Sequence, residues 1–217
     1  MRDRLKIYLV GVGGQGTLTA AWLLGETALR SGIEAVVSEV HGMAQRGGVV
    51  ETSVLLGGYR GPIIGAGAAD VILAFEPLEA LRALRRASSK TWIITNTHPL
   101  KPTTVALKLG EYPNLQESFA EVEDQIAHLI RLDATTLAQG AGSIIATNMV
   151  MLGALVATGL LPFPPEALEE EIEGFHPRFA AVNLRAFRRG QEATMQALAK
   201  AATPDRRSRS NFPPREA

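Results

Sequence analysis

The chain has 217 residues, of which 46% are hydrophobic and 20% are charged. This composition predicts a folded globular protein and excludes a disordered one. The 22 Lys and Arg residues balance the 22 Asp and Glu residues, so the formal net charge is zero. The lack of surplus positive charge argues against a nucleic-acid partner. Cysteine is absent, which excludes disulfides, a thiolate nucleophile and an iron–sulfur cluster held by this chain's own thiolates.

Strand and helix signals alternate through the first half of the chain. Runs of β-branched and apolar residues predict strands, which span 6–10, 34–40, 49–56, 70–75, 92–95 and 128–132. Apolar residues at helical spacing predict helices between them, over 17–30, 77–86 and 118–128. Because strands that alternate with helices form βαβ units, we expect an α/β fold with a Rossmann-like, mostly parallel sheet flanked by helices.

The second half of the chain shows helical patterns only, over 134–141, 143–159, 165–173 and 178–201. We therefore expect a helical C-terminal portion that covers a sheet face or grips a partner. Residues 1–202 are predicted to form a single domain. The stretch 203–217 carries four Arg against one Asp and one Glu, and it is predicted to be a disordered, solvated tail.

One uncharged stretch raises the question of a membrane segment. Residues 144–161 contain no charged side chain over 18 residues, which is the minimum length for a spanning helix. Polar residues and Gly interrupt this stretch and no basic residues flank it, so an enclosed or subunit-interface helix is expected instead. No signal peptide is apparent at the N-terminus, and we expect a cytoplasmic protein without a membrane partner.

A glycine-rich motif lies between the first predicted strand and the first predicted helix. It fits G-x-G-x-x-G, whose glycines allow a tight turn, backbone approach to a phosphate and close helix–strand packing. The residues expected to contact such an anion are Gly11, Gly13, Gly14, Gln15 and Gly16. Thr17 offers a hydroxyl or a helix cap, and Glu39 lies where a dinucleotide fold places its ribose-binding acid. A tight turn without any ligand is the alternative interpretation.

A second distinctive segment is SEVHGMAQRGG at 38–48. It begins at the carboxyl end of the second predicted strand, the edge at which open parallel sheets bind ligands. His41, Gln45 and Arg46 place an imidazole, an amide and a guanidinium on one loop. Arg suits a phosphate, a carboxylate or an acidic partner surface. A loop held by its own hydrogen bonds remains an open alternative.

No residue of the chain is predicted to be catalytic. Neither a Ser-His-Asp arrangement nor a pair of carboxylates stands out. The four His are scattered without the spacing of metal ligands, so no metal site is predicted. Asn148 lies within an apolar helical stretch, where a buried amide needs a hydrogen-bond partner from the core or from a subunit interface.

These motifs resemble the gamma subunits and gamma domains of 2-oxoacid:ferredoxin oxidoreductases. Within that family the chain is most similar to the beta subunits of the indolepyruvate branch. The resemblance covers about residues 5–195, and the HGMAQRGG segment is its most specific part. Further matching residues are Asn96-Thr97, Leu132-Asp133-Ala134 and the block 146–154.

The resemblance implies a reaction and a set of partners. The holoenzyme oxidatively decarboxylates arylpyruvates to aryl-acetyl-CoA and CO2 and passes the electrons to ferredoxin. Thiamine diphosphate with Mg²⁺ and [4Fe–4S] clusters belong to a larger alpha subunit, and coenzyme A is a co-substrate. The absence of Cys agrees with a small non-redox subunit that is inactive alone.

The resemblance leaves two roles open for the glycine-rich loops. In one, both loops form part of the coenzyme A site, with the glycine loop and Arg46 at its phosphates. In the other, both loops dock on the alpha subunit. A pyruvate, 2-oxoisovalerate or 2-oxoglutarate relative and a standalone NAD(P)-binding protein are the further alternatives.

Overall fold

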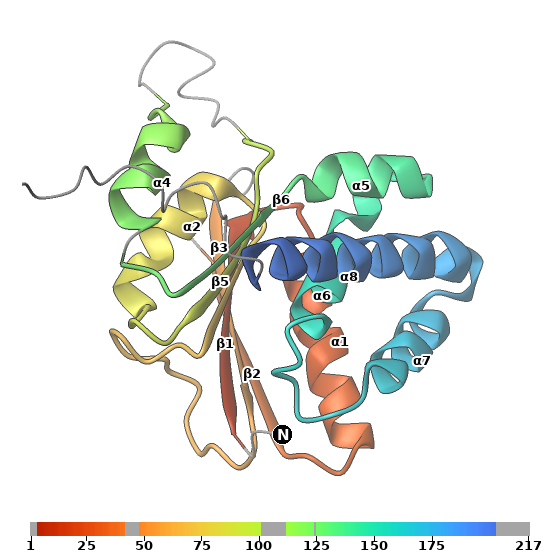
Figure 1. The fold of residues 1–217 in the computed structure, drawn as a ribbon. Helices are drawn as coiled ribbons and strands as arrows, with labels where there is room; N and C mark the ends of the chain where they lie inside the picture. Colours follow the sequence, from red (N-terminus) through yellow and green to blue (C-terminus); the bar gives the residue numbers. More distant parts are fainter. Residues whose placement is uncertain (1–3, 42–47, 101–111, 124, 203–217) are drawn as a thin grey trace, which may run out of the picture.

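A computed structural model of the chain describes residues 4–41, 48–100, 112–123 and 125–202. The predicted tail at 203–217 and the candidate residues Gln45 and Arg46 lie outside these ranges. Figure 1 shows a central sheet with helices against both of its faces. The α/β fold with a helical C-terminal portion is therefore confirmed.

Six strands form one sheet in the described ranges, in the order β2-β3-β1-β4-β5-β6. They are β1 (Leu5–Val12), β2 (Ala35–His41), β3 (Val49–Leu56), β4 (Val71–Ala74), β5 (Trp92–Asn96) and β6 (His128–Leu132). β1, β4, β5 and β6 pair in parallel, whereas β3 runs antiparallel to both β1 and β2. The sheet is mostly parallel, as predicted, and β3 is its antiparallel strand.

The position of β3 separates β2 from β1. Val49 lies opposite Val12 at one end of the β1–β3 pair, and Leu56 lies opposite Leu5 at the other. Leu56 also lies opposite Ala35 of β2. The helical crossover after β1 therefore places β2 two strand positions away from β1. The chain then turns back as β3, which fills the position between them. The carboxyl ends of β1 and β2 still reach the same edge of the sheet.

Helices cover both faces of the sheet. One face carries α2 (Pro77–Ala83), η1 (Leu84–Arg86) and α4 (Leu115–Glu123). The other face carries α1 (Thr17–Arg30), α5 (Ala134–Ala141), η2 (Ile144–Ala146), α6 (Thr147–Val156), α7 (Pro165–Phe175), η3 (Pro177–Phe179) and α8 (Ala180–Ala202). Side chains alternate between the faces along each strand. Ile7 and Leu9 pack in the α1–α6 core, whereas Tyr8 and Val10 pack in the α2–α4 core.

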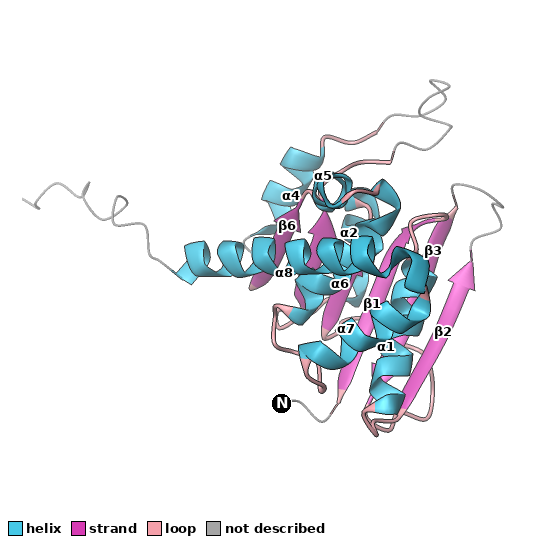
Figure 2. Cartoon of the chain, turned by 90° about the vertical axis from the view of Figure 1, so that its right-hand side faces the viewer, coloured by secondary structure: helices cyan, strands magenta, loops and turns pink. Residues whose placement is uncertain are grey.

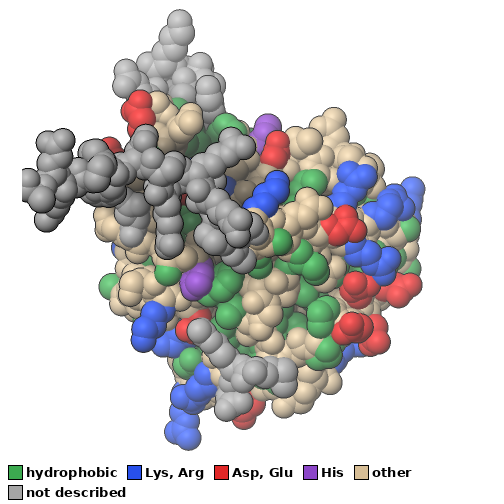
Figure 3. Space-filling view, viewed as in Figure 1, with side chains coloured by type: hydrophobic (Ala, Val, Ile, Leu, Met, Phe, Trp, Pro, Cys, Tyr) green, Lys and Arg blue, Asp and Glu red, His purple; other side chains and the backbone are tan. Residues whose placement is uncertain are grey.

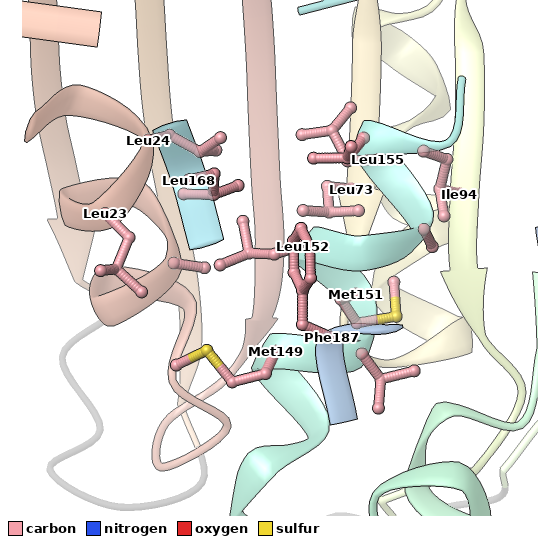
Figure 4. Close-up of a cluster of buried hydrophobic side chains, with 14 of the residues drawn as sticks. Leu23, Leu24, Leu73, Ile94, Met149, Met151, Leu152, Leu155, Leu168 and Phe187 are labelled. Atoms are coloured by element: carbon pink, nitrogen blue, oxygen red, sulfur yellow. The ribbon is translucent and has the colours of Figure 1, made fainter. Parts of the chain in front are cut away.

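Helix α6 lies at the centre of the larger core. Residues 148–156 are all buried, and Figure 4 shows Met149, Leu152 and Leu155 among side chains from α1, β4, β5, α7 and α8. Figure 2 shows α8 crossing in front of α6. In the described part of the chain, no helix is long and apolar enough to cross a membrane. Residues 148–156 of the uncharged stretch thus lie in an enclosed helix, as predicted, whereas Ile144 and Ile145 before it are exposed.

The bounds predicted for two helices were wrong at both ends. The helix expected over 143–159 is divided into η2 and α6, because Ser143 is extended and Thr147 bonds back to the Ile144 carbonyl at 2.7 Å. It also ends early, before Gly159 at a φ of 68°. The helix expected over 118–128 is α4, which begins at Leu115 and ends at Glu123.

The surface of the helical layer mixes charges of both signs. Figure 3 shows Lys and Arg side chains interspersed with Asp and Glu side chains on its right-hand part. Arg188 of α8 pairs with Glu169 of α7 at 2.6 Å, and Arg30 of α1 contacts Glu171 of α7 at 3.0 Å. The second pair joins α1 to α7 through a carboxylate that is almost fully buried.

Candidate functional site

The glycine loop follows β1, from which successive strands of the chain are added on one side first and then on the other. β1 has β3 on one side and β4 on the other, so the carboxyl ends of β1 and β4 border the crevice at which such sheets bind ligands. Gly11 is at the end of β1, and a Cβ there would lie 3.0 Å from the side chains of both Phe75 and Thr17. Gly11 is therefore required for close packing of β1, β4 and α1.

Gln15 bridges the ends of β1 and β4. Its Oε1 accepts from the Val12 N–H at 2.7 Å, and its Nε2 donates to the Phe75 carbonyl at 3.0 Å. These bonds use one donor and one acceptor of the amide inside the protein. The structure therefore shows Gln15 holding the crevice together, a role that the motif alone did not indicate.

Several N–H groups of the glycine loop are already engaged. Gly13 donates to the Gly48 carbonyl at 2.9 Å, and Gln15 donates to the Val12 carbonyl at 3.1 Å. Gly14, at a φ of 98°, would meet nothing within 4 Å if it carried a Cβ, so the backbone is open there. The open backbone of the loop is thus at Gly14, two residues before the N-cap of α1.

Helix α1 begins without a side-chain cap. Its N-cap is Gly16 in the left-handed region, at a φ of 78°. Thr17 is the first helical residue and is buried, so the expectation that it caps the helix was wrong. The N–H groups of the first turn keep their partial positive charge, and a helix N-terminus of this kind attracts anions.

The two glycine-rich segments meet at the carboxyl edge of the sheet. The bond from Gly13 to Gly48 joins the glycine loop to the end of the HGMAQRGG segment. His41 is the last residue of β2, where it pairs with Val50. Gln45 and Arg46 lie outside the described residues, so their predicted contacts stay predictions. The proximity expected for these loops is confirmed at Gly48.

Glu39 does not take the place of a ribose-binding acid. It lies opposite Thr52 of β3, and β3 stands between it and β1. A dinucleotide fold places its second strand beside the first, so that the acid at its end reaches the ribose bound over the glycine loop. That interpretation of Glu39 was wrong, because the chain inserts an antiparallel strand at this position.

Asn148 packs against the glycine loop from α6. A Cβ on Gly16 would lie 2.6 Å from Asn148 Nδ2, so only Gly at this position allows the amide to approach α1. Asn148 Oδ1 accepts from the Met149 N–H at 3.0 Å. The sequence places this amide within an apolar stretch, and the structure places it beside the loop.

Asn96 ties three strand ends together at the same edge. Its Nδ2 donates to the Phe75 carbonyl at 3.2 Å and lies 3.0 Å from Thr135 Oγ1. Its Oδ1 accepts from the Ala134 N–H at 3.1 Å and from the His98 N–H at 3.2 Å. The amide is buried and fully used, so Asn96 is a structural residue of this edge.

Glu76 is a buried carboxylate that sequence analysis missed. It caps α2 by accepting from the Glu79 N–H at 3.0 Å, and it accepts from the Leu100 N–H at 3.2 Å and from the Tyr112 hydroxyl. Burial, followed by the neighbouring Glu76 carboxylate, raises the pKa of Tyr112. The signal that could have revealed Glu76 is its place before Pro77 at the start of a helix.

Glu79 is a second buried carboxylate in this network. Burial raises the pKa of the Glu79 carboxyl, and the Arg82 guanidinium, 2.6 Å away, opposes the rise. In the described ranges, no group of three His, Cys, Asp or Glu could hold a metal ion.

Comparisons with known proteins agree on one family. The protein-family model described as pyruvate ferredoxin/flavodoxin oxidoreductase matches residues 6–193 of this chain. Indolepyruvate oxidoreductase subunit IorB of Methanothermobacter thermautotrophicus is 43% identical over 185 residues, which cover 85% of this chain and 94% of the relative. The 2-oxoglutarate synthase subunit KorC of the same organism is 29% identical over 201 residues, which cover 89% and 96%.

A solved structure shares the fold. The pyruvate oxidoreductase subunit PORC of Thermotoga maritima superposes with a TM-score of 0.66 at 25% identity, over 88% of this chain and 97% of that chain. The two chains therefore share the fold over the matched residues.

Proposed function

The chain belongs to the pyruvate ferredoxin/flavodoxin oxidoreductase family, and from this premise we propose that it is the small subunit of an indolepyruvate-type oxidoreductase. The holoenzyme would convert an arylpyruvate and coenzyme A to aryl-acetyl-CoA and CO2, with ferredoxin as the electron acceptor. The small subunit would be inactive alone and would act in the cytoplasm.

The observation that carries this proposal is the difference in identity between relatives. The chain is 43% identical to an IorB subunit and 29% identical to the KorC subunit of the same organism, over similar lengths. Family membership alone leaves the 2-oxoacid open. The higher identity over nearly the whole relative favours an aromatic 2-oxoacid over 2-oxoglutarate.

The redox cofactors do not fit this chain. An iron–sulfur cluster is held by Cys thiolates, and the sequence contains no Cys. We therefore assign the [4Fe–4S] clusters to a larger alpha subunit, and the family resemblance leads us to assign thiamine diphosphate with Mg²⁺ to that subunit as well. The residues of this chain would bind and orient, and no step of the electron transfer passes through them.

The carboxyl edge of the sheet suits an anionic group of coenzyme A. Gly14 is open, and the first turn of α1 offers N–H groups without a side-chain cap. These donors, together with Arg46, would hold a phosphate and keep the thiol end of coenzyme A directed toward the alpha subunit. The position of β3 beside β1 removes the support for an NAD(P) site at Glu39.

The test is anaerobic co-purification of the chain with its larger subunit, followed by assays with four 2-oxoacids. We expect a complex that contains thiamine diphosphate and iron and that oxidises indolepyruvate or phenylpyruvate at least about tenfold faster than pyruvate or 2-oxoglutarate, a margin equal to about 1.4 kcal/mol. A complex that prefers 2-oxoglutarate would refute the substrate assignment. A lone chain that binds a nicotinamide cofactor would refute the subunit role.

The coenzyme A role is tested separately through Arg46→Ala. In the assembled holoenzyme this change should raise the KM for coenzyme A by about tenfold, because a charge-assisted phosphate contact contributes about 1.5–3 kcal/mol. The KM for the arylpyruvate should stay unchanged. Loss of assembly with an unchanged KM for coenzyme A would show instead that the loop docks on the alpha subunit.

A further inference from the structure

Large apolar side chains gather around one cavity next to the glycine loop. The cavity has a volume of about 320 Å³ and is lined by residues of α1, α6, α7 and α8 and of the short helices η2 and η3. Ile145 and Phe179 are exposed apolar residues that line it, exposed Trp22 contacts the lining residue Phe175, and exposed Leu18 and Ile144 precede the lining residues Thr19 and Ile145 in the chain. We call these five residues the apolar rim: Leu18, Trp22, Ile144, Ile145 and Phe179. A gathered set of exposed apolar side chains marks an interaction site, whereas single ones do not.

The rim is continuous with the walls of the cavity. Ile145 and Phe179 themselves line it, and their side chains are 84% and 53% exposed. The ring of Trp22 lies 5.0 Å from that of Phe175, which forms part of the cavity wall. Leu18 and Trp22 are one turn apart on α1 and share a face. A partner that covers the rim would therefore also fill the cavity.

The polar end of the cavity offers a donor that lacks an acceptor. Asn148 lines the cavity and is only 6% exposed. Its Oδ1 is used by the Met149 N–H, and within the described ranges no hydrogen bond is formed by its Nδ2. The uncapped first turn of α1 lies directly beside it. A donor that faces the cavity beside a helix N-terminus is suited to an acceptor from outside the chain, and a negative one is favoured.

The charges around the cavity argue against a second copy of the same chain. The lining and the rim contain no Asp or Glu, and Arg178 lies on η3 between the cavity residues His176 and Phe179. A two-fold contact centred on this cavity would bring two helix N-termini and two Arg178 side chains close together. A different protein that contributes a carboxylate is the complementary occupant.

Building on the function proposed above, we propose that the apolar rim and its cavity are the docking surface for the larger alpha subunit. The alpha subunit would insert an apolar side chain into the cavity and place a neighbouring carboxylate against Asn148 Nδ2, on the cavity side of the start of α1, whereas the coenzyme A phosphate would bind on the side of Gly14 and Arg46. Such a central anchor within an apolar ring has the form of an interface hot spot.

Ile145→Glu tests the surface, and Ile63→Glu is its matched control. Both side chains are almost fully exposed, at 84% and 82%, but Ile63 lies outside the rim. We expect Ile145→Glu to weaken binding of the purified alpha subunit by about tenfold or more, as for an interface anchor, while Ile63→Glu changes it by less than about twofold. Both isolated variants should keep the wild-type circular dichroism and melting temperature.

Asn148→Asp tests the proposed acceptor. The change keeps the shape of the side chain and replaces the donor with a carboxylate, which the start of α1 tolerates because of its positive partial charge. We expect the affinity for the alpha subunit to fall by about tenfold or more, because two carboxylates then face each other. An unchanged affinity would overturn the proposed contact.

The remaining outcomes separate this proposal from the proposed function. If the wild-type chain captures a thiamine- and iron-containing subunit and Ile145→Glu captures it equally well, the docking surface is wrong and the function stands. If the wild-type chain captures no such subunit, the function itself fails and the docking surface fails with it. A wild-type homodimer in light scattering that Ile145→Glu dissociates would identify a second copy as the occupant and overturn the proposal.

Discussion

The crossing of α6 and α8 depends on two glycines, and Gly190→Ala tests how closely their backbones approach. A Cβ on Gly190 would overlap the Val150 carbonyl oxygen of α6 and lie 2.8 Å from its carbonyl carbon. A Cβ on Gly153 would overlap the Phe187 carbonyl oxygen of α8 and lie 2.8 Å from that carbonyl carbon. Carbon atoms prefer a separation of about 3.5–4.0 Å, so the two helices would have to move apart by about 1 Å.

The expected effect of Gly190→Ala is a net loss of stability. Overpacking of a close core costs about 1–3 kcal/mol or more, and this case lies at the upper end because the obstructing atoms are backbone. The gain in helix propensity offsets about 1 kcal/mol. A net loss of about 2 kcal/mol lowers the melting temperature by about 4–8 °C for a chain of this size.

The control is Gly174→Ala in α7, where an added Cβ meets nothing within 4 Å. It should keep or raise the melting temperature. The double variant Gly153→Ala with Gly190→Ala should lose less than the sum of the single losses, because the first change already separates the helices. Equal melting temperatures for Gly190→Ala and Gly174→Ala would refute the backbone contact.

Two further changes address the carboxyl edge and the buried carboxylates. Gln15→Ala removes the bonds to Val12 and Phe75 and should lower the free energy of unfolding by about 1–3 kcal/mol in urea titrations. Gln15→Glu keeps the acceptor for Val12 but turns a carboxylate oxygen toward the Phe75 carbonyl, so it should be destabilising as well, and a wild-type free energy of unfolding for both variants would contradict the bridging role. Burial raises the pKa of the Glu79 carboxyl above its ordinary value of 4.5, so the folded chain binds the carboxyl proton more tightly than the unfolded chain does. The stability of the wild type relative to Glu79→Gln should therefore fall as the pH rises from 4.5 through the raised pKa. Urea midpoints at about pH 4 and about pH 7 measure this, and a difference that grows in favour of the wild type would show that the pair with Arg82 outweighs burial.

Apolar periodicity and bounding glycines predicted several helices and strands with their correct ends. The strand expected at 49–56 is β3, and the helix expected at 17–30 is α1, each with the predicted ends. Both stretches are bounded by glycines that the sequence displays. The division of the helix predicted over 143–159 was missed because the Thr147 hydroxyl bonds to the Ile144 carbonyl and competes with the helical hydrogen bonds. The periodicity of apolar residues contains no signal for such a bond.

The strand order could not be predicted from the same patterns. A strand that follows another across a short loop pairs with it equally well on either side, so nothing local indicated that β3 would separate β2 from β1. The misplaced expectation for Glu39 follows from this one step. The role of Gln15 was hidden for a related reason, since its second partner, Phe75, lies 60 residues away along the chain.

The glycine motif itself shows why a motif alone did not identify the ligand. Gly11 is explained by contact with Phe75 and Thr17, and Gly16 by contact with Asn148, without any bound molecule. Gly14 has open space where a Cβ would lie. Gly11 and Gly16 are thus required by the packing of β1, α1, β4 and α6, so the proposed binding features are Gly14, the first turn of α1 and the cavity beside Asn148. These three features adjoin one another, so a ligand of the loop and a partner in the cavity would meet at the start of α1.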